Sequence, residues 1–154
     1  MSKSPQGPLE SVLPFATTLH VRDHCLCLHL QRAARAVARI FDEALRPFDL
    51  TNQQFSLLMS LNRPEPPPLG PVAALLGIDR TTLTAALKPL QRRDLVAMIV
   101  GEKDSRRRLL AITPEGIAVL AAAVPVWKRT HAALDARLGD SDPDELRQAL
   151  LALS

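Results

Sequence analysis

The sequence predicts a mainly α-helical protein with one small β-hairpin. Apolar residues recur at steps of three and four along most of the chain, which is the period of an amphipathic helix. Two short aliphatic runs, LVAMIV at 95–100 and RLLAI at 108–112, flank the polar segment GEKDSRR as the strands of a hairpin do. The expected architecture is a single domain, residues 1–154, in which a helix-turn-helix core carries a β-wing between long N- and C-terminal helices.

The composition is that of a soluble globular protein. The chain has 154 residues, 47% of them hydrophobic and 23% charged, so it is long enough to bury one core. The net charge of +3 fits a polyanionic partner, and with only 3% aromatic residues duplex DNA fits better than RNA or single strands. We find no run of about 18 apolar residues and no signal-peptide pattern, so we expect no membrane span and a cytoplasmic location.

The N-terminal part is expected to be an arm followed by a long helix. Residues 1–21 mix Pro, Ser and Gly without a sustained period, which favours an irregular arm. Residues 22–47 are predicted to form one helix that ends at Pro47. Its apolar stripe needs a partner helix and consists of Leu26, Leu30, Ala33, Val37, Ile40 and Ala44.

The middle of the chain, residues 51–113, is predicted to be the DNA-binding region. Its first helix, 51–62, opens with the capping-box pair Thr51 and Gln54, and the PEPPP segment at 64–68 must be extended. A short helix follows, with Pro71 near its start and Gly77 just past its end.

The next helix, residues 80–93, is the expected reading helix. Asp79 is placed to cap it, and Pro89 is expected to interrupt it with a bend. A major groove about 12 Å wide admits one helix, whose N-terminal half reaches the base edges. In that half Arg80 suits a guanine edge, and threonines suit bases or phosphates. The predicted contacts are Arg80, Thr81, Thr82, Thr84 and Lys88.

The hairpin tip is the expected wing over the minor groove or the phosphates. From Asp79 to Arg108 there are eight Lys or Arg residues against four Asp or Glu residues, a local excess of +4. The positive charge is therefore concentrated on this unit. The residues assigned to the wing contact are Lys103, Asp104, Arg106, Arg107 and Arg108.

These motifs resemble those of the MarR family of winged-helix regulators. D-S-R-R-R-L-L-A-I-T-P-E-G, residues 104–116, is similar to the family's wing pattern D-x-R-x-x-x-L-x-L-T-x-x-G, with Ile112 replacing one leucine. D-R-T-T-L-T, residues 79–84, resembles the start of one branch's recognition helix, which usually continues with Arg and Asn instead of Ala85 and Ala86.

The resemblance implies a homodimeric transcriptional regulator that binds double-stranded DNA at a pseudo-palindrome. We interpret the protein as a repressor that is released from DNA when a small, often aromatic, effector or an oxidant changes the spacing of the two reading helices in the dimer. The resemblance also implies that Asp104 steadies Arg106.

The C-terminal residues 114–154 are predicted to form dimerisation helices together with 22–47. Thr113 and Pro114 open a long helix, in which Pro125 should cause a kink and after which Gly139 is a stop. SDPDELRQALLAL, 141–153, starts a second helix. The long helix carries a heptad-like seam, which we assign to pairing with a second copy: Ile117, Leu120, Val124, Trp127, His131, Leu134 and Leu138.

Cys25 and Cys27 leave three interpretations open: small hydrophobic residues in a dimer seam, a redox sensor, or part of a metal site. Within one helix their sulfur atoms would point to different sides, so an intrachain disulfide should require local unwinding. In the organic-hydroperoxide branch of the resembled family a reactive cysteine stands where this chain has Cys27. That branch supports its thiolate with tyrosines, and this sequence has none.

Two classes of function remain. The first is the DNA-binding regulator, and the alternative is a helical protein-interaction module whose hairpin is only a solvated charge cluster. We find no phosphate loop, no H-E-x-x-H and no nucleophile beside a base, so we expect neither an enzyme nor a cofactor. Trp127 fits core packing better than an effector contact, and His131 fits a simple hydrogen-bonded residue better than a pH switch or a ligand-pocket residue.

Overall fold

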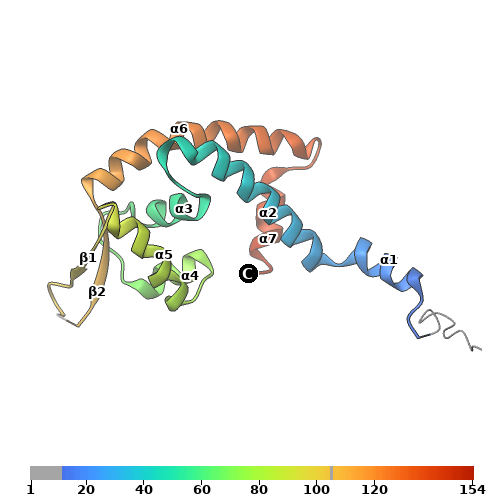
Figure 1. The fold of residues 1–154 in the computed structure, drawn as a ribbon, viewed down its shortest axis with the longest axis horizontal. Coiled ribbons are helices and arrows are strands. Elements are labelled where there is room, and N and C mark those ends of the chain that lie inside the picture. The colour runs from blue at the N-terminus through green and yellow to red at the C-terminus, as the bar shows by residue number, and fades with distance from the viewer. Residues whose placement is uncertain (1–11, 105) are drawn as a thin grey trace, which may run out of the picture. The chain divides into compact units, whose positions relative to one another are not determined.

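The computed structural model describes residues 12–104 and 106–154. The chain divides into a unit that extends to Arg39 and a unit from Ile40 to Ser154. The first unit contains α1 (Phe15–His24) and the beginning of α2 (Leu26–Leu45), whose last turns belong to the second unit (Figure 1).

The expected single helix over 22–47 is wrong, because helical structure begins at Phe15 and is broken at Cys25. The Cys25 backbone is extended, with φ −71° and ψ 103°, and its N–H donates to the Val21 carbonyl at 2.8 Å, which ends α1. Its thiol accepts a hydrogen bond from the Leu28 N–H at 3.4 Å and so acts as the N-terminal cap of α2. A thiol is a weak hydrogen-bond acceptor and not a usual capping group, so the sequence pattern did not predict a helix break at Cys25. Residues 1–11 of the expected arm lie outside the described residues.

The second unit holds the predicted sequence of elements. After the end of α2, a 3₁₀ turn over Arg46–Phe48 leads to the winged part. The elements that follow are α3 (Asn52–Leu61), α4 (Leu69–Leu76), α5 (Arg80–Arg92), β1 (Val96–Val100), β2 (Arg108–Ile112), α6 (Pro114–Asp135), a 3₁₀ turn (Ala136–Leu138) and α7 (Pro143–Leu151).

Local capping chemistry sets most of these boundaries, as predicted. The Thr51 hydroxyl accepts from the Gln54 N–H at 3.2 Å and the Gln54 side chain accepts from the Thr51 N–H at 3.0 Å, which completes the capping box of α3. Gly77 ends α4 at φ 66°, a left-handed conformation that glycine adopts without steric cost. Thr113 caps α6 by accepting from the Gly116 N–H at 3.0 Å.

The helix α5 continues through Pro89 to Arg92, so the expected interruption is wrong, whereas the expected bend stays a prediction. Pro89 removes one backbone hydrogen bond, but the neighbouring Leu87 and Leu90 are 1% and 0% exposed. Their burial holds the last turn in helical form. Similarly, α6 runs through Pro125 without a break.

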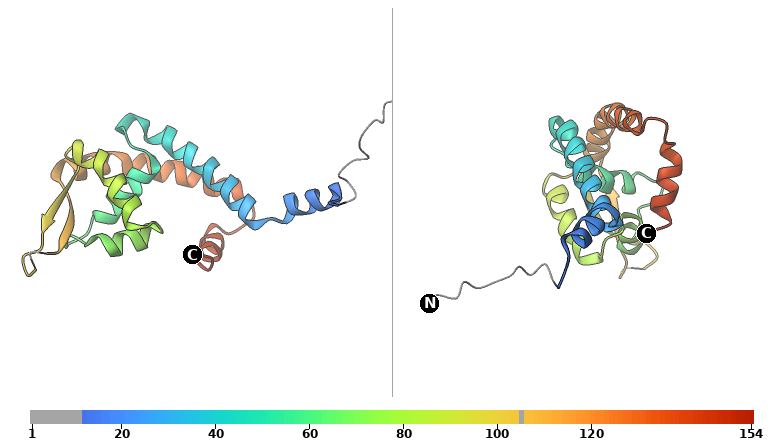
Figure 2. Two further views of the ribbon diagram at one scale, coloured as in Figure 1. Left: turned by 60° about the horizontal axis from the view of Figure 1, so that its bottom comes forward. Right: turned by 90° about the vertical axis from the view of Figure 1, so that its right-hand side faces the viewer.

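The wing is a two-stranded antiparallel sheet in which Val96 pairs with Ile112 and Val100 with Arg108. Figures 1 and 2 show it extending away from the helices of its unit. The PEPPP segment borders it: the Pro67 carbonyl accepts from the Leu110 N–H at 2.8 Å, and Pro68 forms a bridge with Leu109. Because proline has no N–H to donate, this edge pairs only through its carbonyl groups. The predicted extended connector thus fixes the base of the wing.

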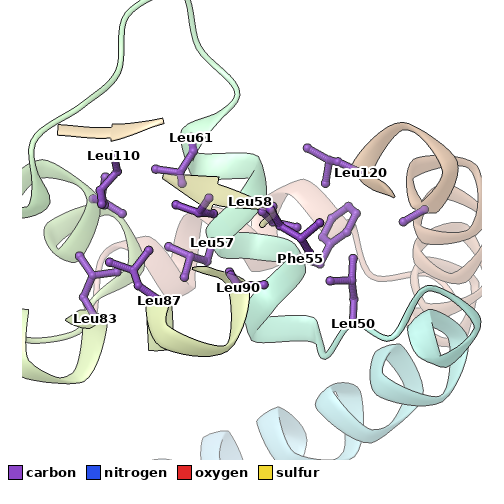
Figure 3. Packing of buried hydrophobic residues seen from close by; sticks show 14 of the residues in the cluster. Leu50, Phe55, Leu57, Leu58, Leu61, Leu83, Leu87, Leu90, Leu110 and Leu120 are labelled. Carbon is purple, nitrogen blue, oxygen red and sulfur yellow. The ribbon is translucent and has the colours of Figure 1, made fainter. Parts of the chain in front are cut away.

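The hydrophobic core lies between α3, α5, β2 and α6. Figure 3 shows Leu57 and Leu58 of α3 among leucines from the other elements. Part of the expected dimer seam belongs to this core: Leu120 is 3% exposed, and Val124, Trp127 and Leu134 pack against the same cluster. These seam residues therefore have a role within one protomer, and the seam alone is no evidence for a second copy.

By contrast, neither α1 nor α7 contains a buried residue. Phe15 and Val21 on α1 are 65% and 54% exposed, and Leu151 on α7 is 63% exposed. Exposed apolar side chains that lie together on a helix are typical of surfaces that another chain covers. Among the described helices, none is long and apolar enough to cross a membrane.

Candidate nucleic-acid interface

The reading helix α5 has one buried and one exposed face. Leu83, Leu87 and Leu90 anchor it in the core with at most 1% exposure. The opposite face, by contrast, is open to solvent. All five sequence-predicted contact residues of this helix are exposed: Arg80, Thr81, Thr82, Thr84 and Lys88.

The threonine hydroxyls of α5 are not equivalent. Asp79 accepts from the Thr82 N–H at 2.7 Å and from the Thr82 hydroxyl at 2.9 Å, and these hydrogen bonds hold the pKa of Asp79 below its ordinary value. The Thr84 hydroxyl donates to the Arg80 carbonyl at 2.8 Å. Among the described residues the Thr81 hydroxyl has no such partner. The Thr82 hydroxyl is therefore bound to the capping residue Asp79, and Thr81 keeps both its hydroxyl hydrogen and its lone pairs for another molecule.

The wing tip is shaped by Asp104. Its carboxylate accepts from the Arg106 N–H at 2.9 Å, and its carbonyl accepts from the Arg107 N–H at 3.0 Å. The Gly101 N–H closes the tip by donating to the Arg107 carbonyl at 2.9 Å. Asp104 thus orders the backbone that carries the arginines. Lys103, Asp104, Arg106, Arg107 and Arg108 are all exposed.

Within residues 12–104 and 106–154, the cations of both elements lack counter-ions. Every ion pair found in the described parts of the chain, with nitrogen and oxygen within 4.0 Å, lies elsewhere. On α5 and the wing, the exposed basic side chains without such a partner are Arg80, Lys88, Arg92, Lys103, Arg106, Arg107 and Arg108. This face of the winged unit is therefore available to an anion.

Comparison with known proteins supports the same interpretation. The model of a winged helix DNA-binding domain matches residues 50–116. MosR of M. tuberculosis, a transcriptional regulator solved in complex with DNA, has 36% sequence identity and a TM-score of 0.76 over 84% of this chain and 93% of MosR. The chain belongs to the MarR family of winged-helix transcriptional regulators.

Other members are similar at lower identity. The transcriptional repressor CouR, bound to a 23-mer DNA duplex, is 29% identical with a TM-score of 0.67 over 97% of this chain and 96% of CouR. BpsR of Bordetella bronchiseptica, whose DNA binding is regulated by 6-hydroxynicotinic acid, is 27% identical with a TM-score of 0.69 over 83% of this chain and 89% of BpsR. SarZ of Staphylococcus aureus is 27% identical over 94 residues, 61% of this chain and 64% of SarZ. These relatives are regulators, and the chain is not an enzyme.

This MarR-family chain also has an aromatic cavity of about 120 Å³ in its second unit. The Trp127 ring lies 6.0 Å from that of Phe55, 6.5 Å from that of Phe41 and 4.7 Å from that of His131, centroid to centroid. Asn52 and Ser56 add polar groups to its wall. Trp127 therefore packs on the core and lines a cavity at once. The sequence did not reveal this, because its walls come from α2, α3 and α6.

His131 connects this cavity to α7. Its Nδ1 lies 3.5 Å from Asp135 Oδ1 and 3.5 Å from Arg147 Nη2. Arg147 donates to both Asp135 oxygens at 2.8 Å and to Asp144 at 2.6 Å, and these carboxylates raise the pKa of Arg147. The guanidinium of Arg147 thereby ties α7 to α6.

The cysteines lie where α1 gives way to α2. Cys25 is half-buried, and Cys27 is exposed and accepts from the Gln31 amide at 3.2 Å. The imidazoles beside them bind backbone carbonyls: His24 Nδ1 lies 2.8 Å from the His20 oxygen, and His29 Nδ1 lies 2.8 Å from the Cys25 oxygen. Within the described residues no three His, Cys, Asp or Glu side chains converge as a metal site would require.

Proposed function

We propose that this chain is a homodimeric, cytoplasmic repressor that binds a pseudo-palindromic DNA duplex through α5 and the wing. The observation that carries the proposal is the set of unpaired, exposed cations shared by these two elements of one packed unit. Exposed guanidinium and ammonium groups without a carboxylate partner are free to bind an external anion. DNA phosphates supply such anions at regular spacing.

The division of labour between the two elements follows from their shapes. An α-helix fits the major groove, so the exposed N-terminal half of α5 is expected at the base edges. A hairpin with a basic tip fits the minor groove or the flanking phosphates. That MosR and CouR were solved with DNA supports the same use here.

Dimerisation is proposed from the helices that bury nothing in one protomer. The apolar residues of α7 are 41% to 63% exposed at Leu146, Leu150 and Leu151, and α1 is comparably exposed. A second copy is the simplest cover for such surfaces and would present two reading helices, one for each half of a palindrome. Their separation should be about one DNA turn, roughly 34 Å.

Release is proposed to follow occupation of the aromatic cavity by a small aromatic effector. A cavity of about 120 Å³ with stacked ring walls and three polar groups suits a single ring with polar substituents. Through His131 it is one contact away from Arg147, which holds α7. The regulation of BpsR by 6-hydroxynicotinic acid supports an effector of this size.

Oxidation by an organic hydroperoxide is the second candidate trigger, favoured by the exposure of Cys27 and by the cap that Cys25 forms. A thiolate that attacks the peroxide O–O bond becomes sulfenic acid and releases the alcohol. Because Cys25 already lies outside a helix, a disulfide between Cys25 and Cys27 requires less unwinding than it would if both residues lay in one unbroken helix. Loss of DNA binding after hydroperoxide treatment of wild type, but not of Cys27→Ser, supports this trigger. Unchanged wild-type binding leaves only the effector.

The experiment that tests the proposed function is selection of genomic fragments followed by analytical ultracentrifugation. We expect a dimer at micromolar concentration and two protomers on each selected duplex. A protein that enriches no duplex but captures a protein partner would instead be the helical interaction module. A monomer that binds duplex would retain the DNA-binding part of the proposal and remove the dimer.

A further inference from the structure

Gly70 lies in the first turn of α4, directly against the side chain of Arg80. A Cβ atom placed on Gly70 would be 3.0 Å from Arg80 Nη2, 3.7 Å from Cζ and 3.8 Å from Nε. Three atoms of the guanidinium group therefore lie within contact range of the space that a side chain would fill. Gly70 has no positive φ, so its backbone conformation does not require glycine. What requires it is the position of Arg80.

The place at which Arg80 is held differs from the place expected for a base-reading arginine. In a helix-turn-helix the second helix enters the major groove, while the helix before it crosses the DNA backbone. Arg80 begins the second helix, α5, but its guanidinium lies against the first turn of α4. It is thus on the side that meets phosphates.

We infer that Gly70 is a positioning residue that seats the Arg80 guanidinium against α4, where it binds a backbone phosphate and does not read a guanine edge. The inference rests on the proposed function, since it requires a duplex on this face. Base selection by the start of α5 then falls to Thr81, whose hydroxyl is free of intramolecular partners among the described residues, and to the methyl group of Thr84.

Gly70→Ala is an unusually clean test because the atom that must yield is the end of a flexible side chain. Arg80 can swing away, so the fold should tolerate the added methyl group, and alanine is a better helix former than glycine. We expect an unchanged or higher melting temperature together with a loss of DNA affinity of about tenfold. The loss should be equal for selected and unrelated duplexes.

The decisive measurement is a double-mutant cycle read by salt-dependent duplex binding. A plot of log K against log salt concentration has a negative slope, and removing one phosphate contact should make this slope shallower by about 0.9 per protomer. Gly70→Ala and Arg80→Ala should each do so, and the double variant should be no worse than Arg80→Ala alone. As a matched control, Gly70→Ala should add its full effect to Lys88→Ala, because the three atoms nearest to the added methyl group all belong to Arg80.

Each outcome decides the inference. Additive effects of Gly70→Ala and Arg80→Ala, or a wild-type affinity in Gly70→Ala, would overturn the positioning role. A selective loss for the preferred duplex in Arg80→Ala, with the salt slope unchanged, would return Arg80 to base reading. If the wild-type protein itself binds no duplex at low salt, the proposed function is wrong. This result differs from every outcome above, because those outcomes compare variants with a wild-type protein that binds.

Discussion

Gly116 shows how a single residue joins the wing to α6. A Cβ on Gly116 would lie 2.2 Å from the Leu95 carbonyl oxygen and 2.8 Å from Ile112 Cγ1. Real Cβ atoms do not approach a backbone oxygen so closely, so the first turn of α6 can pack here only with glycine. This contact gives a physical reason for the glycine that ends the D-x-R wing pattern.

We therefore expect Gly116→Ala to lower the free energy of unfolding by about 2 kcal/mol, as overpacking against a rigid neighbour does. Helix propensity alone predicts the opposite sign, a gain of up to about 1 kcal/mol for replacing glycine by alanine. Urea denaturation of both proteins separates the two effects. A more stable Gly116→Ala variant would show that the contact is not tight.

Asp79 makes the start of the reading helix sensitive to acid. Its pKa is held below the ordinary value because Thr82 donates a backbone and a hydroxyl hydrogen bond to the carboxylate. The unfolded chain therefore takes up the proton first as the pH falls. The resulting stabilisation is complete above about pH 4 and is lost as the pH falls through the lowered pKa of the folded state.

Asp79→Asn keeps a capping oxygen but cannot ionise. We expect the stability advantage of wild type over Asp79→Asn to shrink when chemical denaturation is repeated between about pH 5 and pH 2. If the difference between the two proteins stays constant over that range, the hydrogen bonds of Asp79 do not depend on its charge.

Among the secondary-structure elements, the wing is shaped by hydrogen bonds to Asp104 and takes its positive charge mainly from its arginines. Asp104 accepts from the Arg106 backbone N–H, so it orders the tip without pairing with the guanidinium. We expect Arg106→Ala to weaken binding to all duplexes and to make the negative slope of log K against log salt shallower by about 1 per protomer. Asp104→Ala should reproduce part of this loss, because the tip loses an internal hydrogen bond.

Asp104→Asn separates geometry from charge, since asparagine keeps the acceptor for the Arg106 N–H. Binding close to that of wild type, or somewhat tighter, is expected for Asp104→Asn, because the negative charge near the phosphates is gone. Anisotropy titrations with one duplex compare the three variants. Equal losses in Asp104→Asn and Asp104→Ala would mean that the carboxylate pairs with an arginine side chain instead.

The elements of the winged part were predictable because local rules specify them. Thr51, Gly77, Asp79 and Thr113 each mark a helix boundary by capping chemistry or backbone conformation that depends on near neighbours. The break at Cys25 could not be predicted, since a thiol cap has no sequence signature. The helix also continues through Pro89, because burial of the neighbouring Leu87 and Leu90 in the tertiary core outweighs one lost hydrogen bond.

The candidate site was predictable in its members and not in their roles. The helical period of α5 and the position of the hairpin tip predict that these residues are exposed, and they are exposed in the structure. That Arg80 lies on Gly70 and that Phe41, Phe55 and Trp127 enclose a cavity depend on contacts between separate elements. No spacing within one helix encodes such contacts.

The whole molecule has three features that bear on its function: exposed cations on α5 and the wing, exposed apolar residues on α1 and α7, and an aromatic cavity linked to α7 by His131 and Arg147. The proposed dimer makes these parts depend on one another. If the proposed dimer forms through α7 and α1, movement of either helix should change the distance between the two reading helices, and binding to a palindrome of fixed spacing should respond to that distance.

The most direct test of the central claim is the affinity of the wild-type protein for a selected genomic duplex, measured by anisotropy from about 50 to 300 mM salt. Two protomers with several phosphate contacts each predict a linear plot of log K against log salt, with a slope of about −5 or steeper. The same duplex should bind more tightly than an unrelated one at every salt concentration. No binding at the lowest salt, or an affinity that does not change with salt, would contradict the account.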